Sequence, residues 1–175
     1  MALHIPGAIL NLQNLFLPQI DHPISTLVPT TVALIAHRDI QNLLEAHPMI
    51  ALRILHQTFI ETAISRKWLT SVGRRTAHGS IAHFISEFIV RMRAAGRCEG
   101  NTCDFPLTQT ELGDALGLST VHVNRTVKKL RQDGLISWHH HSLTVHDWDG
   151  LNRIADFDDA YLELRSPGAR RATDT

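Results

Sequence analysis

Two amphipathic patterns separated by a tight turn lie between residues 107 and 136. The first has apolar residues at the i, i+3, i+4 spacing of one helix face: Leu112, Ala115 and Leu116. Thr108, followed three residues later by Glu111, predicts a capping box at the start of this helix. Gly117 comes directly after the apolar positions, where a residue in the left-handed region can end a helix.

The second pattern predicts a helix from Ser119 to Arg131, with Leu118 filling the turn and Ser119 as its N-cap. One face carries the apolar residues Val123, Val127 and Leu130. The other face is polar and cationic and holds Thr120, Val121, Asn124, Arg125 and Lys128. A helix lying in a DNA major groove requires such a division. The ordered set favours a helix-turn-helix over an ordinary helical hairpin with a solvated charged face.

Further elements are predicted around this motif. We expect a helix with one strong apolar face over 81–92, a short strand over 102–107, and a strand-turn-strand over 135–146 whose turn holds three consecutive histidines. A short acidic helix is predicted over 148–164, and 166–175 is expected to be a disordered tail.

A long helix is predicted from Pro48 to Val72, since proline is tolerated in the first turn. Its heptad-like seam consists of Leu52, Leu55, Phe59, Thr62, Arg66 and Leu69, and other apolar residues occupy further faces. A helix that is apolar on more than one side must bury two surfaces. We therefore expect a parallel homodimer, in preference to burial within a monomer, and a hinge at Gly73-Arg74-Arg75.

The first 47 residues have apolar, β-branched runs interrupted by prolines and read as largely strand-like, with a short helix over 39–45. The predicted fold class is α+β and mainly α.

From Thr108 to Ile136, with the strand-turn-strand ISWHHHSLTVHD after it, the chain resembles the winged-helix DNA-binding domain of the Crp/Fnr regulators. The resemblance implies four segments. They are a partial β-roll (cupin-like) sensor remnant over 1–47, a dimerisation helix over 48–73, a winged helix-turn-helix domain over 74–165, and the tail. A full roll needs about twice this length before the long helix. The sequence leaves open a truncated product, a mis-assigned start and a natural short form.

The resemblance also implies the roles of particular residues. The segment STVHVNR matches the start of the family's recognition helix. We assign base readout to Thr120, Val121, Asn124 and Arg125, and phosphate contacts to Thr108, Gln109, Ser119, His122, Lys128 and His140. Arg125 matches the family pattern and can bond guanine O6 and N7. Val121 departs from the glutamate of well-known members, so their consensus site is not carried over.

No cofactor is expected. The positions that match the family's cyclic-nucleotide site are Gly7, Ala8, Asn11, His22 and Pro23, which lack the acid and the arginine that would hold ribose and phosphate. Binding of a cyclic nucleotide is therefore not expected. The N-terminal part also lacks a cysteine cluster for an iron–sulfur centre.

Composition excludes several other classes. The 17 basic and 17 acidic residues cancel, but the basic ones concentrate between Arg53 and Arg97 and leave a local positive surface.

The three consecutive histidines point to different sides of a strand or turn, so no metal site is expected. Cys98 and Cys103 are interpreted as two unrelated thiols rather than a redox switch. No membrane span or catalytic set is found, and a cytoplasmic non-enzyme is predicted.

The leading hypothesis is a sequence-specific transcription regulator that binds a near-palindromic operator in double-stranded DNA as a homodimer. RNA polymerase is a further expected partner if the protein is an activator. The alternative is a non-autonomous dimerisation module that silences a full-length relative. A redox or metal sensor ranks last.

Overall fold

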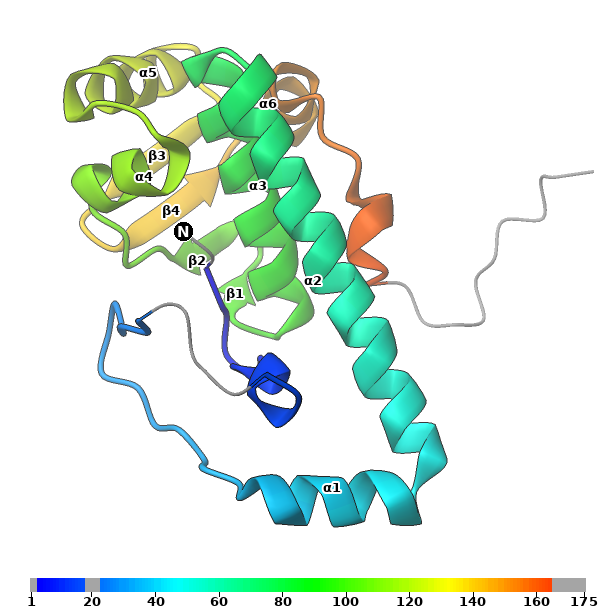
Figure 1. Cartoon of the computed structure of the whole chain (residues 1–175). Helices are drawn as coiled ribbons and strands as arrows, with labels where there is room; N and C mark the ends of the chain where they lie inside the picture. The colour runs from blue at the N-terminus through cyan, green and yellow to red at the C-terminus, as the bar shows by residue number, and fades with distance from the viewer. Residues whose placement is uncertain (1–2, 18–22, 165–175) are drawn as a thin grey trace, which may run out of the picture.

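The computed structural model of the protein describes residues 3–17 and 23–164, and it is mainly helical with one small sheet, as predicted (Figure 1). The elements in chain order are η1 (Leu12–Leu15), α1 (His37–Ala46), α2 (Pro48–Arg74), α3 (Ala77–Ala94), β1 (Cys98–Glu99), β2 (Thr102–Asp104), α4 (Gln109–Leu116), α5 (Thr120–Gln132), β3 (Ile136–His139), β4 (Ser142–Val145), α6 (Trp148–Ala155) and η2 (Asp159–Leu162).

Helix α3 lies at the centre of the fold. It begins at the N-cap Thr76, whose hydroxyl accepts a hydrogen bond from Gly79 N, and nearly all of its residues from Gly79 to Met92 are buried. Helices α2, α5 and α6, η2 and the first two strands all pack against it. Beside the predicted apolar face, its polar residues His83, Glu87 and Arg91 are also buried, so other elements cover it from several sides.

The four strands form one antiparallel sheet in the order β1-β2-β4-β3. Strands β3 and β4 pair with Trp138 opposite Leu143, and β2 pairs with β4 with Cys103 opposite Leu143. Phe105, which is fully buried, follows β2 and packs edge-to-face against Phe84, Phe88 and Trp138. This aromatic cluster attaches the sheet to α3 and fixes the chain just before α4 begins.

Helix α2 runs from α1 at one end of the molecule to the domain at the other (Figure 1). The predicted hinge lies slightly later than expected, because the helix continues through Gly73 and Arg74 and the chain turns extended at Arg75. On the inner side, Ile64 is buried and the ring of Trp68 packs 5.4 Å from that of Phe84. On the outer side, apolar residues remain exposed.

The acidic helix predicted over 148–164 is divided in two. Helix α6 ends at Ala155, and Asp156 adopts a left-handed conformation with φ +46°. A residue in this conformation cannot continue an α-helix. The chain therefore turns and places η2, with buried Leu162, back against α2 and α3. The predicted tail over 166–175 lies outside the described residues.

The strand-like reading of the N-terminal region is wrong for the part that the structure describes. Residues 3–17 and 23–36 contain η1 but no strand, and α1 is slightly longer than the predicted helix. The run from Ile24 to Ile35 bends at Leu27 and Val28 and, apart from the half-buried Leu27, leaves its apolar side chains exposed, including Leu34 at 94%. β-branched residues stabilise a strand only when a neighbouring strand pairs with it and covers a face. The described part of this region supplies no such neighbour.

The interpretation of the two cysteines is also wrong, because they form a disulfide. Gly100 and Asn101 reverse the chain between β1 and β2, and the ladder sets Cys98 opposite Cys103 with their Cα atoms 4.4 Å apart. This separation is within the range that a disulfide can bridge. The sequence gives their spacing but not their register across a hairpin.

His83 is a buried histidine on α3, 2% exposed, at the junction with α6 and η2. Its Nδ1 lies 3.3 Å from the carbonyl oxygen of Ala155, and its Nε2 lies 3.3 Å from the hydroxyl of Tyr161. Burial lowers the pKa of His83 to about 4, and the charges of Arg75 and Lys67 act in the same direction. The folded protein therefore holds this imidazole neutral.

This pKa predicts how stability depends on pH. In the unfolded chain a histidine titrates near 6.5, so between about pH 6.5 and 4 the unfolded state binds up to about one more proton at this residue. The contribution of His83 to stability is complete above pH 6.5 and is lost as the pH falls through this range. Urea unfolding of the parent and of His83→Gln at pH 7, 6 and 5 measures the effect. We expect the unfolding free energy of His83→Gln to fall less between pH 7 and pH 5 than that of the parent. An equal fall in both proteins would contradict this prediction.

Candidate nucleic-acid interface

The first helix of the motif begins with the predicted capping box. Glu111 N donates to the Thr108 hydroxyl oxygen at 3.2 Å, and Thr108 N donates to the Glu111 carboxylate at 2.7 Å. The hydrogen bonds from the Thr108 backbone and hydroxyl hold the pKa of Glu111 below its usual range. The hydroxyl proton of Thr108 is already donated to that carboxylate at 2.8 Å. A phosphate contact through this hydroxyl would have to replace that bond.

The turn between α4 and α5 depends on two glycines. Gly117 is left-handed, with φ +67°, and caps the end of α4 as predicted. Gly113 lies where the chain after the turn crosses α4, since a Cβ built there would meet the carbonyl oxygen of Leu118 at 2.6 Å. Leu118 N also donates to the carbonyl of Gly113 at 2.9 Å. This close backbone approach sets the position of α5 relative to α4.

Helix α5 has the two faces that the sequence predicts. Val123, Thr126, Val127 and Leu130 are buried. All four residues assigned to base readout are exposed, and so is Lys128. The most informative of them is Val121, because an aliphatic side chain left 75% exposed on a helix surface has no role in packing this fold. The Ser119 hydroxyl accepts from His122 N at 3.4 Å, so the helix start is capped as expected.

One contact within this surface was not predicted. The side-chain amide of Asn124 on α5 donates to the side-chain oxygen of Gln109 on α4 at 3.2 Å. The sequence assigned Asn124 to bases and Gln109 to phosphates, without connecting them. The bond fixes the amide of Asn124 while its oxygen and one N–H stay available. Only the crossing of the two helices brings these side chains together, so no sequence signal could have shown it.

The β3–β4 hairpin forms the wing beside the motif. His140 is exposed at its tip in a left-handed conformation, with φ +53°, and its carbonyl accepts from the indole N–H of Trp138 at 3.1 Å. The next residue, His141, is close enough to Glu111 for its charge to contribute slightly to the lowered pKa of that carboxyl. The wing tip and the start of α4 therefore lie close together.

The proposed dimer seam lies on α2. Leu52, Leu55, Phe59 and Leu69 are 57%, 49%, 60% and 73% exposed, and Thr62 is exposed as well. A run of large apolar side chains along one side of a helix, open to water in a single chain, is a typical site of protein association.

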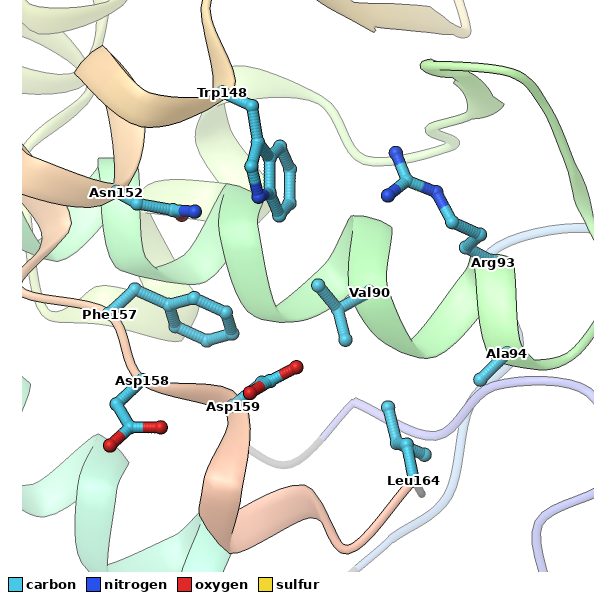
Figure 2. Close-up of a pocket in the computed structure, with 9 residues that line it drawn as sticks. All are labelled: Val90, Arg93, Ala94, Trp148, Asn152, Phe157, Asp158, Asp159 and Leu164. Carbon is cyan, nitrogen blue, oxygen red and sulfur yellow. The ribbon is translucent and has the colours of Figure 1, made fainter. Parts of the chain in front are cut away.

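Other kinds of site are less well supported. A pocket of about 580 Å³ lies between α3, α6 and the segment before η2, with Arg93 above the ring of Trp148 at 5.2 Å (Figure 2). None of the residues assigned to DNA contact lines it. Within the described ranges, we find no group of histidines, cysteines and acids that could hold a metal ion. No helix in that part of the chain is long and apolar enough to cross a membrane.

Comparison with known proteins agrees with this geometry. Residues 81–154 match the family of Crp-like helix-turn-helix domains. The chain is 34% identical over 100 residues to the transcriptional activator protein FnrL of Cereibacter sphaeroides, covering 55% of this chain and 40% of that protein. It is 27% identical to the nitrogen fixation regulation protein FixK of Bradyrhizobium diazoefficiens, covering 67% and 49%. The chain thus spans less than half the length of these relatives.

The solved structure of FixK2 from Bradyrhizobium japonicum has a similar fold, with a TM-score of 0.58 and 16% identity, covering 69% of this chain and 59% of that one. The fold and the α4–α5 surface define a winged helix-turn-helix protein. Residues 81–154 are therefore a Crp-like helix-turn-helix domain, similar to those of the Crp/Fnr regulators. FnrL is named as a transcriptional activator and FixK as a regulation protein, and neither as an enzyme, in agreement with the sequence prediction.

The glycine at the helix crossing provides a test of the motif. Gly113→Ala places a methyl group against the backbone oxygen of Leu118. Because a backbone atom cannot move aside without shifting α5, we expect a loss of about 1–3 kcal/mol of unfolding free energy. The matched control is Gly73→Ala, since that helical glycine has no atom near its Cβ position. The control should be neutral or slightly stabilising. Equal effects in urea unfolding would show that the crossing is not tight.

Proposed function

We propose that this chain is a sequence-specific DNA-binding transcription regulator that acts as a homodimer on a near-palindromic operator. The observation that carries the proposal is the division of α5, whose apolar face is buried while its polar and cationic face is exposed. Together with the match to Crp-like helix-turn-helix domains, this favours a recognition helix in the major groove. A regulator acts where its operator DNA lies, which agrees with the cytoplasmic localisation expected from the sequence. RNA polymerase is a further partner if it activates transcription.

In the proposed complex, Arg125 reads a guanine through O6 and N7, and Val121 contacts a thymine methyl group. Asn124, held by Gln109, presents its remaining amide groups to a neighbouring base. Lys128, Gln109, Ser119 and His122 bind phosphates around this face, and His140 binds one from the wing. Dimerisation through α2 places the two recognition helices about 34 Å apart, one turn of the double helix.

A second function has one observation in its favour. The exposed apolar side chains between Ile24 and Ile35, together with the outer face of α2, suit a module that associates with a longer relative and silences it.

The experiment that separates the two functions is binding-site selection from random duplex DNA, with the purified chain and no ligand. A symmetric motif with half-sites about 10 base pairs apart supports the regulator. Sequence-blind binding alone supports the non-autonomous module.

Replacement of Arg125 by alanine tests base readout. We expect a loss of about 1–3 kcal/mol in operator binding and a relaxed preference at one base pair, because the bidentate guanidinium contact is removed. Fluorescence anisotropy with the selected operator and with each single-base variant measures both. Wild-type affinity and unchanged preference in Arg125→Ala would rule out the readout assignment.

Replacement of Lys128 by alanine tests the phosphate assignment. Because phosphates are the same in every sequence, operator and random duplex should lose similar affinity, and the salt slope should fall by about one. A titration at several potassium chloride concentrations measures the slope. A loss confined to the operator would instead assign Lys128 to base readout.

Replacement of Phe59 by aspartate tests the seam. The side chain is 60% exposed in one chain, so the substitution should leave the fold intact but introduce a charge into the apolar contact between two chains. Sedimentation equilibrium should show a dimer for the parent and mostly monomer for Phe59→Asp. Gln57→Asp, on an exposed position of α2 with no seam residue three or four positions away, is the matched control and should remain dimeric. A dimeric Phe59→Asp would place the interface elsewhere.

A further inference from the structure

Glu87 is an unexpected residue in the middle of α3. It is 1% exposed and lies in the helix at the centre of the core. A carboxylate removed from water is strongly unfavourable unless donors surround it, so its position requires partners. One partner is Arg91, one turn later on the same helix and also buried, at 3.3 Å. That pair alone would connect α3 only to itself.

The other two donors come from different elements. The indole N–H of Trp68 on α2 donates to one carboxylate oxygen of Glu87 at 3.0 Å. The hydroxyl of Tyr161 on η2 donates to the other oxygen at 2.6 Å. One buried carboxylate therefore connects the long helix, the central helix and the C-terminal turn. Hydrogen bonds to a charged acceptor are stronger than those between neutral groups.

Further contacts hold Tyr161 in place. Its ring stacks on that of His83 with an interplanar angle of 9°, and Lys67 on α2 lies 5.4 Å above its centre. Burial and the adjacent carboxylate of Glu87 keep the pKa of Tyr161 far above its usual range, so the hydroxyl remains a donor. Both of the donors outside α3 therefore have defined orientations.

We propose that Glu87 is a positioning residue that fixes the angle between α2 and the DNA-binding domain through Trp68 and Tyr161. We call this group of three residues the Glu87 junction. The consequence of this positioning rests on the proposed function: a fixed angle gives the two recognition helices of a DNA-binding dimer a fixed separation. Without the junction, each domain would rotate on its α2, and one operator spacing would no longer be favoured.

The location of the junction supports this role. Leu52, Leu55 and Phe59 of the seam belong to the half of α2 that follows α1, whereas α5 lies at the opposite end of the molecule from α1 (Figure 1). A small rotation where α2 meets α3 is therefore magnified at the recognition helix. The covalent connection at Arg75 and Thr76 is short and extended, and does not by itself fix that angle.

Spin-label distances in the free protein test the positioning directly. Cysteines introduced at exposed Ser65 on α2 and Arg131 on α5 carry the labels, under conditions that keep the Cys98–Cys103 disulfide closed. Dilution with unlabelled chain leaves only distances within one chain. We expect one narrow distribution for the parent, and a displaced second population in Trp68→Phe and Tyr161→Phe. Trp148→Phe, which replaces the indole beside Arg93 with a smaller ring away from the junction, is the matched control and should resemble the parent.

DNA binding distinguishes positioning from a general loss of stability. With the selected operator, Trp68→Phe and Tyr161→Phe should bind about tenfold more weakly and tolerate altered half-site spacing, because joint engagement of both half-sites depends on geometry. Their affinity for a single half-site and their dimerisation should match the parent. An equal loss for operator and half-site would overturn the inference in favour of a purely structural role.

The outcomes separate this inference from the proposed function. If both junction variants keep the distance distribution of the parent, the inference is wrong whatever the protein binds. If the parent shows no preference for any DNA sequence, the proposed function is wrong. The distance comparison then still decides whether the Glu87 junction fixes the domain.

Discussion

The burial of α3 on nearly all sides is the constraint on which the rest of the structure depends. A helix that buries both an apolar face and polar residues such as His83, Glu87 and Arg91 is stable only when other elements cover that face and supply partners for those residues. The sheet, α5, α6, η2 and the end of α2 provide that cover. Because all of them pack against the same rigid helix, their positions relative to one another are determined together.

Covering α3 uses one face of each surrounding helix and leaves the other face to water. On α5 the outward face is polar and cationic, with Arg125 and Lys128 exposed beside Val121. On α2 the outward face is apolar and includes Phe59. These two surfaces differ in the partner they suit, since the first complements a polyanion and the second another apolar surface. The two partners of the proposed regulator, DNA and a second copy of the chain, therefore each suit one of the faces that remain exposed once α3 is covered.

The region before α2 differs from the rest of the chain. Apart from the half-buried Leu27, its apolar residues from Ile24 to Ile35 are exposed, and it forms no strand in the described residues. The relatives FnrL and FixK are longer than the part that this chain matches. The two regions differ because a strand needs a neighbouring strand to form its backbone hydrogen bonds. Helices α1 and α2 form theirs within the helix.

The sequence by itself determined the features that depend on neighbouring residues. The capping box of Thr108 and Glu111, the left-handed Gly117 and the faces of α5 all follow from interactions within a few positions, and all are present. The long helix and strands β2, β3 and β4 were also predicted from the sequence, but β1 and the pairing of β2 with β4 were not. Tertiary structure decided the pairing of Cys98 with Cys103, the break at Asp156, the bond from Asn124 to Gln109, and the burial of Glu87. Each joins residues or elements whose distance apart only the packed core fixes.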